Sequence, residues 1–215
     1  TTTVLNNLTT TQATALTTTQ VQGLTTTQLN TLSTTNLDAL NAGKLSTTQV
    51  GGLTSTTVNN LTGTQISNLT GAQVAVLTAA QIGVLDTTEL NGLSTTQAGA
   101  LTAAQLGHLT TTVLNNLTTT QATALTQTQV NGLTTTQLDG LSAAKVAALD
   151  AGDLSTTQLA GVAVATLDKL TTTQAAALTT AQTQSLTTTQ LNALSTANLD
   201  ALDAGDLSTT QLAGV

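Results

Sequence analysis

Cysteine, proline, methionine and all three aromatic residues are absent from this 215-residue chain. Without cysteine there is no disulfide framework, no zinc–thiolate or iron–sulfur site and no cysteine nucleophile. Without aromatic side chains there is nothing on which nucleic-acid bases can stack. Charge is scarce too, because only 3 Lys and Arg oppose 10 Asp and Glu. The resulting net charge of -7 argues against a surface that binds polyanions.

An eight-residue period runs through the whole chain. It divides the sequence into 25 octads, interrupted by three five-residue inserts at 41–45, 150–154 and 203–207. A fixed period over the full length predicts stacking repeat units, so we interpret residues 1–215 as a single repeat array. The array starts and stops in mid-pattern, and we expect it to be a segment of a longer chain.

The octad reads T-T-T-Q-Φ-x-x-L, where Φ is aliphatic. Position 1 is Thr, Ser or Asp in 24 octads, Ala163 being the exception, and position 4 is Gln or Glu in 18. Thr followed three residues later by Gln is a capping box, and the preceding Leu with the aliphatic position 5 forms a hydrophobic staple. Two helix-start signals in one phase predict one very short helix per octad, roughly over positions 2 to 7.

These features predict an all-α solenoid, a superhelical rod of very short helices with positions 2 and 3 facing water. A Thr-rich β-solenoid is the alternative, because Thr is β-branched, but strict two-residue alternation is missing. A helix shorter than about 12 residues is marginal alone, so stability must come from stacking. Neither the hand of the rod nor the number of octads per turn follows from the pattern.

The inserts read N-A-G-K-L or D-A-G-D-L. We expect Gly43, Gly152 and Gly205 to be residues just after a helix, with φ > 0, so that each insert lengthens the preceding helix by about one turn. The inserts would then adjust the register of the rod at corners. Glycines near the ends of octads, such as Gly52 and Gly140, are expected at turn or C-cap positions.

No catalytic, cofactor-binding or metal-binding residue is predicted. His108 has no second histidine or cysteine to share a metal or haem. The only acidic pattern that suggests Ca²⁺ is a three-residue spacing, which the first insert does not keep. That spacing is seen at Asp200, Asp203 and Asp206 and again at Asp150 and Asp153.

Two further groups of side chains are interpreted as caps. Asp86 and Glu89 form an acidic version of the capping box rather than a catalytic pair. The serines at position 1 interchange with Thr and have no general base beside them, so a nucleophile is not supported. These are Ser33, Ser46, Ser94, Ser142, Ser155, Ser195 and Ser208.

The pattern L-[ST]-T-x-Q-[VIL]-x-x-L resembles the octad arrays of very large bacterial exported repeat proteins, often labelled haem-utilisation or adhesion proteins. The resemblance implies an extracellular or cell-surface fibre, filament or stalk, although no residue here could carry the haem function. We therefore expect a non-enzymatic structural protein without cofactors. The alternative is an ice-binding or other surface-binding Thr-rich solenoid.

The expected partner is a second copy of the chain, by head-to-tail or lateral contact. Neither terminal octad is an atypical polar cap, since the first recurs at 110–117 and the last at 155–162. Nucleic acid, a small-molecule substrate and a membrane span are not expected.

Overall fold

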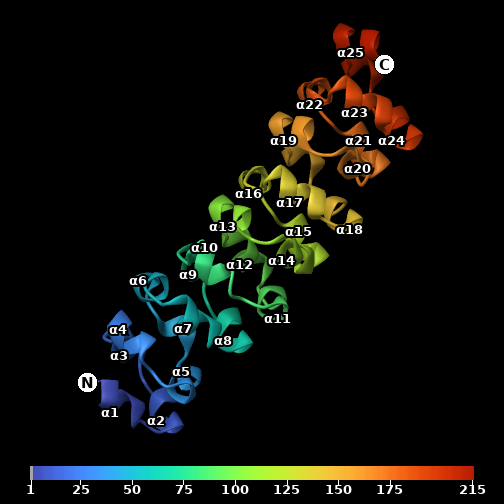
Figure 1. Ribbon diagram of the computed structural model, residues 1–215. Helices are drawn as coiled ribbons and strands as arrows, with labels where there is room; N and C mark the ends of the chain where they lie inside the picture. Colours follow the sequence, from blue (N-terminus) through green and yellow to red (C-terminus); the bar gives the residue numbers. More distant parts are fainter. Residues whose placement is uncertain (1) are drawn as a thin grey trace. The chain divides into compact units, whose positions relative to one another are not determined.

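A computed structural model describes residues 2–215, and the side chains from residue 3 onward (Figure 1). Within these residues each octad forms one α-helix, each insert forms a 3-10 helix, and no strand is present. The predicted all-α solenoid of short helices is confirmed, and the alternative of a Thr-rich β-solenoid is wrong. The cap predicted at Thr1 lies outside the described residues.

The chain forms two compact units, Thr1–Leu109 and Thr110–Val215. The helices of the first unit are α1 (Thr2–Asn6), α2 (Thr10–Thr14), α3 (Thr18–Gln22), α4 (Thr26–Asn30), α5 (Thr34–Ala39), η1 (Ala42–Lys44), α6 (Thr47–Gly51), α7 (Ser55–Asn59), α8 (Gly63–Ser67), α9 (Gly71–Ala75), α10 (Ala79–Ile82), α11 (Thr87–Asn91), α12 (Thr95–Ala100) and α13 (Ala103–Gly107).

The second unit is built in the same way. Its helices are α14 (Thr111–Asn116), α15 (Thr119–Thr123), α16 (Gln127–Asn131), α17 (Thr135–Gly140), α18 (Ala143–Val146), η2 (Ala151–Asp153), α19 (Thr156–Gly161), α20 (Val164–Leu167), α21 (Thr172–Ala176), α22 (Thr180–Ser185), α23 (Thr188–Ala193), α24 (Thr196–Ala201), η3 (Ala204–Asp206) and α25 (Thr209–Gly214).

The capping box explains where the helices begin. Every octad with Gln or Glu at position 4 has both reciprocal bonds of the box. In α10, the Thr78 N–H donates to the Gln81 side-chain oxygen at 2.6 Å, and the Gln81 N–H donates to the Thr78 hydroxyl at 3.2 Å. Position 1 is extended, so the chain turns sharply before each helix.

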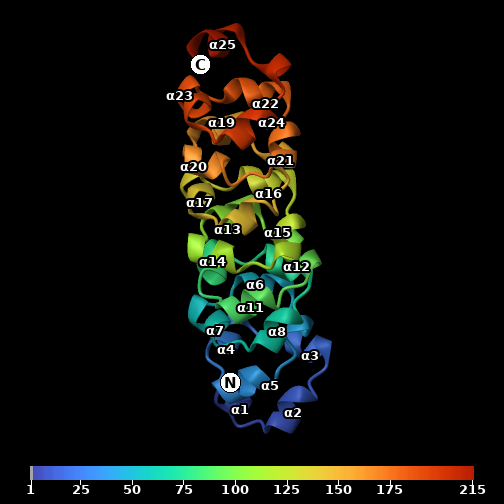
Figure 2. The same ribbon diagram turned by 90° about the vertical axis from the view of Figure 1, so that its right-hand side faces the viewer.

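Within each unit the helices stack with three elements per turn of the solenoid. In unit 1, α2 packs on α5, and α10 packs on both α7 and α13. In unit 2, α19 packs on α22, and the two lie side by side in Figure 1. Figure 2 shows the ribbon of each unit passing from layer to layer in the order of its colours. A helix such as α10 is thus supported by the turns before and after it, as helices of four to six residues require.

Positions 5 and 8 form the core. Ile66 and Ile82 at position 5 are fully buried, and Leu69 and Leu85 at position 8 are buried as well. Position 3 is exposed in every octad, as predicted. Position 2 differs from the prediction in several octads, where it is half-buried. Thr111, for example, is half-buried against Gly140 of the following turn, and Val164 is half-buried too.

The expectation for the inserts was wrong. Each insert is a separate 3-10 helix capped by its own first residue, as when the Asn41 side chain accepts from the Gly43 N–H at 3.0 Å. None of the glycines in the described part of the chain has a positive φ. The sequence A-G-K or A-G-D therefore starts a new helix with an Asn or Asp cap instead of ending the previous one.

Each insert takes the place of a whole octad within the turn. The Asn115 side chain donates to the Gly140 carbonyl 25 residues later, and the equivalent bond from Asn192 to Gly214 spans only 22. An insert lies within the second pair and not within the first. The span shortens by three residues, which is the difference in length between an octad and an insert.

Candidate functional site

The most regular polar feature is a ladder of side-chain amides that crosses from turn to turn. The Gln81 side-chain oxygen closes the capping box of α10, while its Nε2 donates to the carbonyl oxygens of Val50 and Leu53 at 3.3 and 2.6 Å. These acceptors belong to positions 5 and 8 of the octad four elements back. One glutamine therefore starts its own helix and also satisfies the carbonyls at the end of another.

The same bonds recur through both units, and we call them the glutamine ladder. Its members and acceptor pairs include Gln49 to Val21 and Leu24, Gln65 to Leu37 and Leu40, Gln97 to Ile66 and Leu69, Gln105 to Val74 and Leu77, Gln158 to Val130 and Leu133, Gln182 to Ala151 and Leu154, Gln190 to Leu159 and Val162, and Gln211 to Thr183 and Leu186.

Burial makes the ladder energetically important. Gln81 is 2% exposed, and the other glutamines of the ladder named above are also buried. A buried amide that loses its partners costs about 1–3 kcal/mol, and no buried side-chain polar atom in the described part of the chain lacks a partner. The ladder therefore fixes how one turn sits on the next, in a way that aliphatic contacts alone would not.

A second row of bonds comes from Asn or Asp at position 6. The Asn115 side chain donates to the Gly140 carbonyl and accepts from the Ser142 N–H at 2.8 Å. Asp168 accepts in the same way from the Ser195 N–H at 2.9 Å. These side chains satisfy backbone hydrogen-bonding groups where one helix ends and the next begins.

Two lysines replace missing glutamines. The octad 163–170 has Ala163 as its cap and Thr166 at position 4, so it can form no capping box. Asp139 compensates by accepting from the Ala163 N–H at 2.9 Å and the Thr166 hydroxyl at 2.6 Å. Lys169 donates to the Asp139 and Leu141 carbonyls at 2.8 and 2.7 Å. Lys44 of the first insert likewise donates to the Leu16 carbonyl at 2.5 Å.

The acidic residues of the inserts have structural roles. Asp150 and Asp203 accept from the N–H groups of Gly152 and Gly205, and Asp206 accepts from the Thr180 hydroxyl at 2.6 Å. Burial raises the pKa of Asp153 above its ordinary value, and the nearby Asp150 carboxylate raises it further. Over residues 2–215 no three acidic, histidine or cysteine side chains are grouped so that they could hold a metal ion.

The acidic capping box forms as predicted. Asp86 accepts from the Glu89 N–H at 2.8 Å, and Glu89 accepts from the Asp86 N–H at 2.9 Å. Desolvation raises the pKa of Glu89, the bond from the Asp86 N–H lowers it, and the Asp86 carboxylate raises it again.

The remaining candidates lie at helix ends. His108 is the exposed C-cap residue of α13, with Nδ1 at 2.7 Å from the Ala104 carbonyl oxygen. The position-1 serines Ser33, Ser46, Ser94, Ser155 and Ser208 accept cap bonds, whereas Ser142 and Ser195 make no side-chain cap bond. The structure brings none of these groups together into a constellation that could perform acid–base or nucleophilic chemistry.

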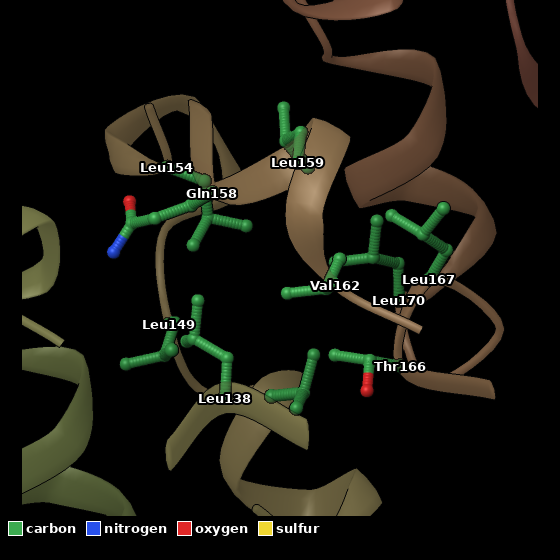
Figure 3. Close-up of a pocket in the computed structure, with 10 residues that line it drawn as sticks. Leu138, Leu149, Leu154, Gln158, Leu159, Val162, Thr166, Leu167 and Leu170 are labelled. Carbon is green, nitrogen blue, oxygen red and sulfur yellow. The ribbon is translucent and has the colours of Figure 1, made fainter. Parts of the chain in front are cut away.

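A small cavity in unit 2 lies between α17, α19 and α20 (Figure 3). Its volume is about 10 Å³, and Leu138, Leu159 and Leu167 are among its mostly aliphatic lining residues. Its two polar neighbours are already engaged, since Gln158 donates to the Val130 carbonyl and Thr166 donates to Asp139. A space of this size holds one water molecule at most, so it is a packing defect beside the atypical octad 163–170.

Among residues 2–215 no helix has the length and apolar character needed to cross a bilayer. No family model and no curated protein matches the chain.

Sequence reasoning placed each glutamine in a capping box but missed its second set of bonds. The available signal was that Gln is used at position 4 in 17 octads and Glu in one. Both side chains can accept from the cap N–H, but only Gln can donate at neutral pH. That preference is explained by the carbonyl acceptors of the neighbouring turn.

Proposed function

We propose that the chain is a non-enzymatic structural segment that serves as an extended spacer or fibre. The observation that carries this proposal is the glutamine ladder, in which each turn presents carbonyls that the glutamines of a later turn can bind. A surface that is regenerated at every turn supports growth by addition of octads.

The resemblance of the octad to those of bacterial exported repeat proteins supports an extracellular or cell-surface setting, as a stalk or a filament. The composition is compatible with that setting, because a chain without cysteine or methionine offers no thiol or thioether to oxidants. Self-association, head-to-tail or lateral, is part of the same proposal. Few charges oppose contact between copies.

Deletion of whole turns tests the spacer. Removing the three octads 54–77 deletes one turn and leaves every glutamine in phase, so the shortened chain should fold with the same helical content per residue. Small-angle X-ray scattering should show a shorter particle with an unchanged cross-section. A matched deletion of 54–73 removes 20 residues, breaks the phase of the octads and should lower the melting temperature.

A ligand screen tests the same proposal by asking whether the chain binds a small molecule. If the chain is a spacer, no small molecule in the screen should both raise its melting temperature and protect a single turn from hydrogen exchange. Such a ligand would contradict the proposal and identify a binding protein.

A further inference from the structure

In the interior of unit 2, the octad 142–149 is held by fewer side-chain hydrogen bonds than its neighbours. Ser142 makes no side-chain cap bond, and the helix that follows, α18, has only four residues. Lys145 stands at position 4, where most octads have a ladder glutamine. Its side chain donates no hydrogen bond within the described residues. The octad therefore lacks both contributions that glutamine makes elsewhere.

The octad 155–162 shows what these contributions are. It also begins with Ser, and Gln158 closes a capping box with Ser155. The Nε2 of Gln158 donates to the carbonyl oxygens of Val130 and Leu133 at 2.9 and 2.7 Å. These bonds tie α19 to an earlier turn of the same unit.

In α18 the equivalent acceptors would be the carbonyl oxygens of Leu114 and Leu117, which lie four elements earlier in α14 and at its end. Lys145 donates to neither of them. The start of α18 is tied to that turn by Asn115 instead, whose side-chain oxygen accepts from the Ser142 N–H at 2.8 Å. Asn115 is thus a single tether in the place of a capping box and a ladder rung.

The ladder rung that reaches α18 from the following turn is also less protected than others. The Nε2 of Gln174 donates to the carbonyl oxygens of Val146 and Leu149 at 3.1 and 2.7 Å. Gln174 is half-buried, whereas Gln190, which binds the carbonyls of octad 155–162, is 5% exposed. Water therefore competes more readily for the bonds of Gln174.

Two cavities border the same octad. The cavity between α17, α19 and α20 is lined in part by Val146 and Leu149 (Figure 3). A second cavity of about 10 Å³ has Leu114, Lys145 and Leu149 among its lining residues. Side chains that face a void lose van der Waals contacts on that side. The two buried aliphatic side chains of α18 and its end are therefore packed incompletely.

We propose that the octad 142–149 is a local opening site, which leaves its place in unit 2 while the other octads stay folded. The free energy of local opening is low where buried contacts are few and hydrogen bonds are exposed. Opening here breaks the bonds from Asn115 and Gln174 and leaves the other rungs of the unit intact. In a spacer it would supply one defined point of flexibility, but the opening itself does not depend on that function.

Lys145→Gln restores the missing bonds and is the central variant. With Ser142 it completes a capping box, and its amide can donate to the carbonyls of Leu114 and Leu117. Lys145→Met is the matched control, because it removes the same charge and adds neither a donor nor a cap acceptor.

Hydrogen exchange followed by NMR measures the opening. In the wild-type chain the amides of 146–149 should exchange about 100-fold faster than those of 159–162, because one octad has the cap and the rung and the other has neither. Lys145→Gln should remove most of this difference, and Lys145→Met should leave it. Equal protection of the two octads in the wild type, or equal effects of the two variants, would overturn the proposal.

Trypsin gives a second measurement, because the chain has only 3 Lys and Arg. Lys44 and Lys169 are bound to backbone carbonyls through Nζ, so the first cut should follow Lys145. Asn115→Ala removes the tether and should speed that cut about 10-fold, since cleavage follows the population of the open form. The control is Asn131→Ala, at an exposed side chain without a hydrogen bond in the described part of unit 2. Equal rates in the two variants would contradict the tether and the opening site.

Discussion

The side-chain amide of Gln81 lies between its own helix cap and the end of another turn, with Nε2 at 2.6 Å from the Leu53 carbonyl oxygen. The Gln81 side-chain oxygen is also 2.6 Å from the Thr78 nitrogen. One side chain therefore couples local helix initiation to the stacking of turns. This coupling explains how helices of four to six residues persist, because the start of such a helix is also a tertiary contact.

Gln81→Glu should destabilise unit 1 by about 2–4 kcal/mol, because it buries a carboxylate against two carbonyl oxygens while leaving the capping box intact. Gln20→Glu is the control, since Gln20 has the same local role and an exposed amide. It should change stability by less than about 0.5 kcal/mol. Urea unfolding followed by circular dichroism at low protein concentration measures both. Equal effects would mean that the cap alone determines the role of Gln.

Much of the fold follows from the octad. Thr78 and Gln81 predict the start of α10, and Ile82 and Leu85 predict its buried face. What the octad does not reveal is the partner of Gln81, because Val50 and Leu53 lie 31 and 28 residues earlier. That separation depends on three elements per turn, a tertiary property to which many residues contribute small amounts.

The prediction that the inserts lengthen the preceding helix was wrong because their local sequence is ambiguous. Asn41 and Gly43 fit the end of a helix as well as the start of one, since Gly is common after helices and Asn is common before them. The structure selects the second option, because an insert that forms its own 3-10 helix fills one place of the turn.

Gly140→Ala should destabilise unit 2 by about 1 kcal/mol, because a Cβ there would lie 2.5 Å from Cγ2 of Thr111. Adding Thr111→Ser removes that methyl group and should restore stability to at least the wild-type value, since Ala favours the helix over Gly. Gly99→Ala, where an added Cβ meets nothing within 4 Å, should be stabilising. A double-mutant cycle that shows no coupling between residues 111 and 140 would contradict this packing.

Glu89→Gln should stabilise unit 1 at pH 7 by about 1 kcal/mol, because the amide can donate to the carbonyls of Val58 and Leu61, which occupy the usual acceptor positions. The folded state raises the pKa of Glu89 above its ordinary value of 4.5. The contribution of protonated Glu89 to the stability of the fold is therefore fully present below the pKa that this side chain has in the unfolded chain. It is lost as the pH rises through the pKa of Glu89 in the folded state.

Urea unfolding of the wild-type chain and the Glu89→Gln variant from pH 4 to pH 7 checks this sign. The stability advantage of the variant over the wild type should grow as the pH rises. A difference that shrinks with rising pH would show that the ionised carboxylate is favoured by the fold.

Lys169→Met should destabilise unit 2 by about 1–3 kcal/mol, because the Asp139 and Leu141 carbonyls lose their charged donor. Lys145→Met is the comparison, since the Lys145 side chain donates no hydrogen bond within the described residues and should tolerate the change. Thermal unfolding of the two variants distinguishes them, and a larger loss in the Lys145 variant would refute the assigned role of Lys169.

The most direct test of the glutamine ladder is hydrogen exchange of the glutamine side-chain amides, followed by NMR on ¹⁵N-labelled protein in dilute solution. Gln49, Gln65, Gln81 and Gln97 should exchange far more slowly than a free amide, because their Nε2 groups are buried and donate to carbonyls of another turn. Gln12 and Gln20, which close capping boxes but reach no other turn, should exchange like free amides. Uniformly fast exchange of all six would contradict the ladder and leave only the capping role.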